Sequence, residues 1–391
     1  MKKLKRILFI SNAYPRASDP CNCPPVGYKL AHMRKEGVIV NILSLEKASL
    51  LKSRNFLHII KFFLVLLLPI ITIERHKFIG EEYKIFRAHY GRISKIFLPI
   101  FLYILIRINQ YDVFSYQFLW STTELPFLKR VFNKPSVITI HGSDLHETAV
   151  ENLVEYEKFK FAIKTADKII YVSKGLRKIS EDIGLSSNKD LVITNGYDPE
   201  IFKVNQKKAK FPVFGFVGHL YSVKRADKLP EIFNLIKKSI PNAKLIIVGG
   251  GIKKQNLRLE MEKGFKEYGI EEDIEFVGEV LPNEVANYYS EMDVLLFPSR
   301  REGFGAVVIE ARACGIPVVG SDNGGIPEAV GEGGIIVKDG RDFERRFASA
   351  AVNLYRDLPS RDTINKGVSR YSWPELVKIE LALYEKLIKF N

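Results

Sequence analysis

The chain has 391 residues, of which 46% are hydrophobic and 27% charged, with a formal net charge of +14. A single hydrophobic core stops growing at roughly 250–300 residues, so this length predicts two domains. The three cysteines are too few for a disulfide scaffold and have no histidine pair at zinc spacing nearby, so we expect a reducing, cytoplasmic protein without a metal site.

The excess positive charge lies in the first third of the chain. Residues 1–134 hold 22 Lys and Arg against 8 Asp and Glu, whereas residues 135–391 hold 37 against 37. No DNA- or RNA-reading motif accompanies this charge, so nucleic acid is not an expected partner. The basic N-terminus leads into ILFI, which is too short for a signal peptide and is typical of a first strand.

Two very apolar stretches occupy the same third, at 55–73 and 95–108. The first is nominally long enough to cross a bilayer, but Lys61 lies inside it and Pro69 interrupts it. The pattern therefore disfavours a membrane span. It leaves open a buried core helix and a helix lying on a membrane surface.

Short apolar, β-branched runs alternate with helical patterns along the whole chain. We expect seven strands in the first half and six in the second, at 5–10, 38–45, 82–88, 111–118, 136–141, 168–173 and 191–194, then 211–217, 244–249, 274–278, 294–298, 317–320 and 334–337. This alternation predicts an α/β fold with two doubly wound, Rossmann-like parallel sheets. Their facing cleft is the expected ligand site, because open α/β sheets bind ligands at the carboxyl ends of their strands.

The polar stretch KVNQKKAK at 203–210 sets the predicted domain boundaries. We assign residues 1–205 to an N-terminal domain, 206–372 to a C-terminal domain and 373–391 to a final helix. On that helix Leu376, Ile379, Leu383 and Leu387 share one face. The apolar face predicts that the helix packs on its own domain or crosses back to the first.

One loop, PSRREGFGAVVIEARACG, follows the strand at 294–298 and opens a helix. Free N–H groups at a helix start favour an anion, and Gly303 and Gly305 leave room for a phosphate to approach. Glu310 is placed to accept the two hydroxyls of a ribose, and Glu302 to hold a second sugar beyond the phosphates. Taken alone, two such glutamates more often simply cap and solubilise a helix. Together with the glycines they favour a nucleoside diphosphate sugar, with uridine or guanosine as the nucleoside.

Two neighbouring stretches strengthen this interpretation. SDNGGIPEAV at 321–330 supplies another Gly-Gly turn after a strand, positioned for backbone donors beside the same sheet edge. FVGHLYSVKRADKL at 216–229 places a turn at Gly218, followed by Lys224 and Arg225 at the start of a helix. Such a cation pair is suited to phosphate, although a Lys-Arg pair on its own is more often a solvated face.

With these motifs the chain resembles a retaining nucleotide-sugar glycosyltransferase of family 4, which has the two-Rossmann-domain glycosyltransferase-B fold. The resemblance is strong at 214–337, where VGHLYSVKRADKL, LIIVGGG and the run from FVGEVLPNEV to GGIPEAV follow the order of the family's motifs. It is fair in ITIHGSDL, IIYVSKGLRK and ITNGYDPEIF. It is weak in the first third, as is expected of an acceptor-binding region.

The resemblance implies roles for individual residues on the donor side. Glu310 would bind the ribose, Glu302 would hold the donor sugar near its reacting carbon, and Lys224 would neutralise the diphosphate. Gly303, Phe304 and Gly305 would give backbone contacts to sugar and phosphate.

On the acceptor side, His141 of HGSD would reach the donor sugar across the cleft, and Gly27 would stand at the family's N-terminal glycine turn. The chain departs from the family at His219, where an arginine is usual after the glycine of VG. The diphosphate is then one cation short unless Arg225 or a protonated His219 substitutes.

The resemblance also implies transfer without a metal or other cofactor and with retention of anomeric configuration. The charge map predicts an acceptor glycan or lipid-linked saccharide at the anionic inner face of a cell membrane, with peripheral association of the N-terminal domain and a bacterial surface polysaccharide as product. Two alternatives stay open. One is a same-fold epimerase or phosphorylase, and the other is a catalytically silent protein that binds sugar nucleotides.

Overall fold

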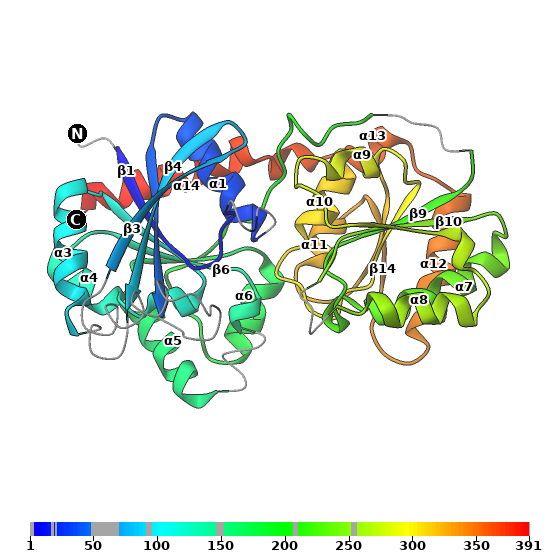
Figure 1. The fold of residues 1–391 in the computed structure, drawn as a ribbon, viewed down its shortest axis with the longest axis horizontal. Helices are drawn as coiled ribbons and strands as arrows, with labels where there is room; N and C mark the ends of the chain where they lie inside the picture. Colours follow the sequence, from blue (N-terminus) through cyan, green and yellow to red (C-terminus); the bar gives the residue numbers. More distant parts are fainter. Residues whose placement is uncertain are drawn as a thin grey trace, which may run out of the picture. The chain divides into compact units, whose positions relative to one another are not determined.

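The computed structural model describes residues 4–16, 19, 22–47, 70–90, 96–145, 152–205, 210–251 and 256–390. Its contacts divide the chain into two units (Figure 1). Unit 1 comprises the described residues of Met1–Tyr171, Ser180–Ile193 and Val377–Asn391, and unit 2 those of Val172–Ile179 and Thr194–Leu376. The second unit's main segment therefore begins at Thr194 rather than at the expected residue 206, and it ends at Leu376.

Unit 1 is built on one eight-stranded sheet with the order β3-β4-β2-β1-β5-β6-β7-β8. The strands are β1 (Arg6–Ile10), β2 (Ile39–Lys47), β3 (Ile70–Phe78), β4 (Glu81–Tyr90), β5 (Val113–Gln117), β6 (Ser136–Ile140), β7 (Lys168–Tyr171) and β8 (Asp190–Val192). All neighbours pair in parallel except β3 and β4. The seven strands expected from the sequence are all present.

The eighth strand, β3, was not expected. It forms an antiparallel hairpin with β4 around a turn at Ile79 and Gly80, both of which have positive φ. The helix predicted over 55–73 is therefore wrong for residues 70–73, which are extended; residues 55–69 lie outside the described part of the chain. The physical reason is that the β-branched Ile70, Ile71, Thr72 and Ile73 favour a pleated strand once β4 offers a paired edge.

The helices of unit 1 connect its strands. They are α1 (Pro24–Lys35), α3 (Leu98–Asn109), α4 (Leu125–Phe132) and α5 (Leu153–Thr165), while α6 (Lys174–Asp182) and α14 (Trp373–Phe390) contribute residues to both units. Most of the second apolar stretch, from residue 98 onward, thus forms α3. Within the described residues, no helix is both long enough and apolar enough to cross a membrane.

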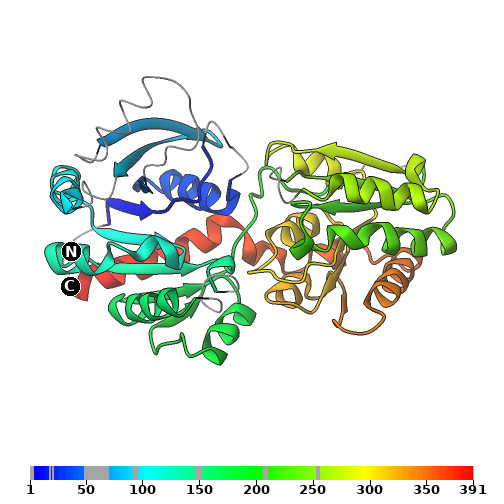
Figure 2. The ribbon, with the colours of Figure 1, turned by 60° about the horizontal axis from the view of Figure 1, so that its bottom comes forward.

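Helix α14 runs beside the strands of unit 1 from Val377 onward (Figure 2). The predicted apolar face is displaced from the observed one. Ile379 is 55% exposed, whereas Glu380 is 1% exposed and Tyr384 is fully buried. The buried face therefore contains Leu376, Glu380 and Tyr384, which are spaced four residues apart. Glu380 is charged, so a search for apolar periodicity does not detect it.

Unit 2 has a fully parallel six-stranded sheet with the order β11-β10-β9-β12-β13-β14. The strands are β9 (Val213–Val217), β10 (Lys244–Val248), β11 (Ile274–Gly278), β12 (Val294–Phe297), β13 (Val318–Ser321) and β14 (Gly334–Val337). The helices are α7 (Leu229–Ser239), α8 (Arg258–Glu267), α9 (Val285–Tyr289), α10 (Ala306–Ala313), α11 (Ile326–Val330), α12 (Phe343–Arg356) and α13 (Arg361–Asn365).

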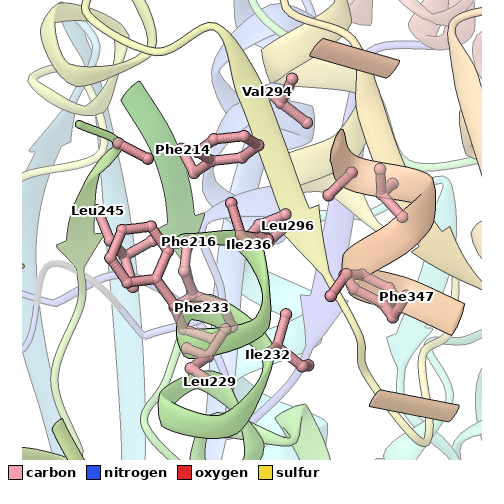
Figure 3. Packing of buried hydrophobic residues seen from close by; sticks show 14 of the residues in the cluster. Phe214, Phe216, Leu229, Ile232, Phe233, Ile236, Leu245, Val294, Leu296 and Phe347 are labelled. Atoms are coloured by element: carbon pink, nitrogen blue, oxygen red, sulfur yellow. The ribbon is translucent and has the colours of Figure 1, made fainter. Parts of the chain in front are cut away.

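One face of this sheet is closed by a large hydrophobic cluster (Figure 3). Phe214 and Phe216 of β9 and Leu296 of β12 pack there with Phe233 of α7 and Phe347 of α12, all buried. The alternation of side chains along each strand places every second residue in this layer. A firmly packed sheet fixes the positions of its carboxyl ends, from which the candidate site is built.

Candidate active site

The centre of the site is the loop between β12 and α10. Glu302 is half-buried, whereas Gly303, Phe304 and Gly305 are buried. Gly305 precedes the helix with φ 98°, a left-handed conformation that favours glycine. The amide of Val308 already donates to the Gly305 carbonyl at 2.9 Å. The N–H groups of the residues before it have no acceptor within the helix, so this helix start can receive an anion.

Lys224 reaches this loop from the other side. It ends the 3-10 turn Ser222–Lys224, which follows β9, and its Nζ forms an ion pair with Glu302 Oε2. The turn is held in place because Arg300 N donates to the Val223 carbonyl at 2.8 Å. The side chains of Lys224 and Glu302 are 20% and 18% exposed, so an ammonium and a carboxylate stand together at the surface of the sheet edge.

The Gly-Gly turn of 321–330 lies directly against the Glu302 loop. A Cβ on Gly324 would approach the Glu302 carbonyl oxygen to 2.0 Å, and one on Gly325 would approach the Gly303 carbonyl oxygen to 2.5 Å. Gly325 N donates to the Glu302 carbonyl at 3.3 Å. Only glycine permits such close backbone contact, so the two loops form one continuous wall of main-chain groups.

Glu310 projects from α10 and is held by a tyrosine of a different helix. The Tyr289 hydroxyl lies 3.1 Å from the Val307 carbonyl and 3.2 Å from Glu310 Oε2. Burial raises the pKa of the Glu310 carboxyl to about 7, and the hydrogen bond from Tyr289 only partly offsets this effect. Glu310 is therefore close to its midpoint of ionisation at neutral pH.

Gly218, His219 and Arg225 frame the Lys224 side of the site. Gly218 follows β9, and the exposed His219 ring stacks on Tyr221 with centroids 5.1 Å apart. Arg225 is only 5% exposed; its guanidinium donates to the Pro298 carbonyl at 3.0 Å and to Asp339. Of the two cations expected to replace the family's arginine, Arg225 is therefore enclosed and fixes the loops, whereas the His219 ring is exposed.

The other two predicted residues belong to unit 1. His141 follows β6, its ring packs on Phe118 with centroids 4.3 Å apart, and its Nε2 lies 3.1 Å from Gln117 Oε1. Burial and the nearby Lys29 hold the pKa of His141 well below its usual value, so its imidazole is neutral.

The loop that carries His141 is anchored by Asp144. This buried carboxylate accepts hydrogen bonds from the Leu119 and Gly142 amides at 3.0 and 2.8 Å. Gly27 lies within helix α1, so the glycine turn expected there is not present. A Cβ on Gly27 would lie 2.6 Å from Pro15 Cγ, and this close packing is the physical reason for the glycine.

Sequence reasoning missed two residues that contact the loop before α10 and the Gly-Gly turn. Ser173 Oγ donates to the Gly303 carbonyl at 2.6 Å, and a Cβ on Gly175 would lie 2.1 Å from the Gly324 carbonyl oxygen. Both residues lie in the IIYVSKGLRK stretch. Its resemblance to the family was recognised, but the sequence did not indicate these contacts. Tyr289, the partner of Glu310, stood in an ordinary helical pattern that gave no signal.

The site thus combines a helix start with N–H groups suited to an anion, a lysine, two carboxylates in different environments and a wall of backbone groups. Two solved structures share this architecture over nearly the whole chain. Sucrose-phosphate synthase from Thermosynechococcus elongatus superimposes with a TM-score of 0.76 at 20% identity, covering 99% of this chain and 100% of that one. Anabaena HepE in complex with UDP-glucose gives 0.69 at 16% identity, covering 97% and 99%. The fold is therefore glycosyltransferase-B, as expected.

The family follows from the sequence comparisons. The profile described as Glycosyl transferases group 1 matches residues 198–361, and that of Glycosyltransferase Family 4 matches 31–201. The capsular polysaccharide biosynthesis glycosyltransferase CapM of Staphylococcus aureus is 30% identical over 273 residues, 61% of this chain and 68% of that protein. This chain belongs to the family 4 glycosyltransferases.

Other relatives match over different lengths. An uncharacterised glycosyltransferase of Methanocaldococcus jannaschii is 29% identical over 271 residues, 66% of this chain and 71% of that protein. The D-inositol 3-phosphate glycosyltransferase of Corynebacterium urealyticum is 30% identical over 217 residues, which are 50% of this chain and 51% of that enzyme. The chain thus spans about half the length of the latter.

Proposed function

We propose that the protein transfers a sugar from a nucleoside diphosphate sugar to an acceptor glycan or lipid-linked saccharide, with retention of anomeric configuration. The observation that carries this proposal is the Lys224–Glu302 ion pair beside the start of α10. It puts a cation for a diphosphate and a carboxylate for sugar hydroxyls next to each other. The UDP-glucose bound in the Anabaena HepE structure supports this donor class.

In the proposed reaction the bond between the sugar's anomeric carbon and the leaving phosphate oxygen breaks, and a bond to the acceptor oxygen forms on the same face. The leaving phosphate oxygen takes the proton of the acceptor hydroxyl. Lys224 and the N–H groups at the start of α10 stabilise the charge that develops on the diphosphate. Glu302 orients the sugar through its hydroxyls, and Glu310 accepts the ribose diol.

The test is binding followed by product analysis. Calorimetry with a panel of nucleotides in the presence of a chelator should reveal micromolar binding of UDP or GDP and of the matching sugar nucleotide. With an acceptor present, chromatography should detect a glycosylated product whose anomeric centre, read by NMR, retains the donor's configuration. No nucleotide binding would contradict the proposal, and free sugar as the only product would indicate a hydrolysing enzyme of the same fold.

Donor affinity is expected to depend on pH through Glu310. Its pKa of about 7 means that the carboxylate is progressively protonated below neutrality, so the Kd of the sugar nucleotide should rise below that point, by at most about tenfold per pH unit. Both phosphates of a sugar nucleotide are esterified and do not titrate in this range. Calorimetry from pH 5.5 to 8.5 measures the profile, which Glu310→Gln should flatten.

Protonation of Glu310 is expected to weaken donor binding but to increase the stability of the folded protein. Because the folded pKa of Glu310 lies above the ordinary glutamate value of 4.5, the folded state binds more protons than the unfolded state between these two values. Protonation of Glu310 therefore stabilises the fold as pH falls through this window. A parallel loss of stability and affinity below pH 7 would assign the effect to unfolding rather than to Glu310.

We propose further that unit 1 associates with the anionic inner surface of a cell membrane, where a lipid-linked acceptor of surface polysaccharide synthesis would be found. Helix α3 supports this proposal. Ile100 and Ile104 are 56% and 52% exposed, and Ile96 and Ile108 extend the same stripe. The end of the helix borders a hollow of about 890 Å³ whose lining includes Lys5, Arg6, Arg107 and Lys134. Apolar and basic groups side by side suit an anionic bilayer surface.

The variant Ile100→Glu/Ile104→Glu should therefore lose membrane binding. Wild-type protein is expected to sediment with phosphatidylglycerol vesicles at low salt and much less at 0.5 M salt, because screening weakens the basic contribution. Leu259→Glu, at an apolar site in unit 2 that is 80% exposed, serves as the control and should bind like wild type. Equal absence of wild-type binding to anionic and neutral vesicles would favour a soluble acceptor.

A further inference from the structure

A chain of buried hydrogen bonds in unit 1 connects His141 with helix α14. His141 Nε2 lies 3.1 Å from Gln117 Oε1, and Gln117 Nε2 donates to Ser115 Oγ at 2.8 Å. Ser115 Oγ lies 3.0 Å from the hydroxyl of Tyr384, which donates to Glu380 Oε1. Ser115 and Gln117 are two residues apart on β5, so their side chains project from the same face of the sheet.

The chain ends in a buried ion pair. Glu380 Oε2 lies 2.9 Å from Lys29 Nζ of α1, and the two side chains are 1% and 2% exposed. Burial of two charges is costly unless they are paired and hydrogen-bonded, and here the Tyr384 hydroxyl satisfies the second carboxylate oxygen. Neither Lys29 nor Glu380 lies in the loops that carry Lys224 and Glu302. The proposed reaction therefore does not explain this buried ion pair.

Donor and acceptor counting fixes the direction of the chain. An ionised carboxylate only accepts hydrogen bonds, so Tyr384 gives its single hydroxyl hydrogen to Glu380. The Tyr384 oxygen must then accept from Ser115, and the Ser115 oxygen accepts from the amide nitrogen of Gln117. The amide oxygen of Gln117 is left to face His141, so the hydrogen of the neutral imidazole resides on Nε2.

We propose that Glu380 and Tyr384 are positioning residues that hold His141 as its Nε2-protonated tautomer, so that Nδ1 accepts a hydrogen bond from a sugar hydroxyl. This inference rests on the proposed function, because it requires His141 to contact the donor sugar. Helix α14 then does more than pack on unit 1. Its Glu380 carboxylate is the acceptor that sets the direction of every hydrogen bond between Tyr384 and His141.

The tautomer can be observed directly by NMR of protein labelled with ¹⁵N-histidine, with the His141 signals identified by their loss in His141→Ala. Wild type should show hydrogen on Nε2. Tyr384→Phe removes the hydroxyl that accepts from Ser115, and Ser115→Ala removes the next member of the chain. Each variant should give a mixture of tautomers and a kcat lower by about tenfold, the scale of one hydrogen bond, with unchanged Kd for the nucleoside diphosphate alone.

Tyr111→Phe is the matched control, because this buried tyrosine of unit 1 also has a bonded hydroxyl, which accepts from Asn41 at 3.0 Å. It should leave the His141 tautomer and kcat unchanged. Hydrogen on Nδ1 in wild type, or wild-type tautomer or kcat in both folded variants, would overturn the inference. The spectra are recorded without substrate, so a wild-type protein that neither binds nor transfers sugar would instead contradict the proposed function.

Discussion

Replacement of Lys224 by alanine is expected to lower kcat by at least about 100-fold, the scale for losing one electrostatic partner of a transition state. The Lys224 ammonium is paired with Glu302 at the edge of the loop that precedes α10. In the proposed reaction it faces charge that grows as the bond to the diphosphate breaks, so its contribution is larger in the transition state than in the bound donor. Steady-state kinetics with saturating sugar nucleotide measure the effect.

The neighbouring Lys228→Ala is the control, since its Nζ is 3.9 Å from Glu344 and 37% of the side chain is exposed. It should retain near-native kcat. Glu302→Ala should cost a similar factor to Lys224→Ala. Because the two residues form one ion pair, the double replacement should lower kcat by less than the product of the two single-variant factors. A Glu302→Ala enzyme with near-native turnover would remove that carboxylate from the reacting sugar.

Much of unit 2 could be predicted from the sequence because its signals are local. The glycines and charged residues of the β12–α10 loop follow a strand and open a helix, so their position at the carboxyl edge of a parallel sheet follows from topology. The proximity of Lys224 to Glu302 follows in the same way, because β9 and β12 are paired neighbours. Adjacent strands bring their following loops together.

The features that could not be predicted depend on contacts distant in sequence. The sequence of residues 70–73 fits an apolar helix and a strand equally well. Only the pairing with β4 decides between the two. Arg225 looks like a surface cation until Asp339 and the Pro298 carbonyl enclose its guanidinium. Glu380 is polar by type, yet Lys29 of α1 makes its burial possible. Each outcome was set by a partner that periodicity does not reveal.

Among the residues proposed for the site, His141 has an environment that suits it to a role in the proposed reaction. It lies on a loop held by the buried Asp144, its ring packs on Phe118, and its pKa is lowered by burial and by Lys29. A neutral imidazole cannot serve as a counter-ion for the diphosphate. It can exchange one well-directed hydrogen bond with a sugar hydroxyl, and such contacts raise kcat when they strengthen as the sugar moves toward the transition state.

His141→Ala is therefore expected to lower kcat by at least about 100-fold while leaving the Kd of the nucleoside diphosphate without sugar unchanged. Because the lowered pKa keeps the imidazole neutral above pH 6.5, the ratio of wild-type to variant kcat should stay constant from pH 6.5 to 8.5. His76→Ala, at a half-buried histidine in β3, should match wild type in both measurements. A ratio that falls toward one as pH rises would mean that His141 acts as a cation, and equal loss of nucleotide affinity would place it on the diphosphate rather than on the sugar.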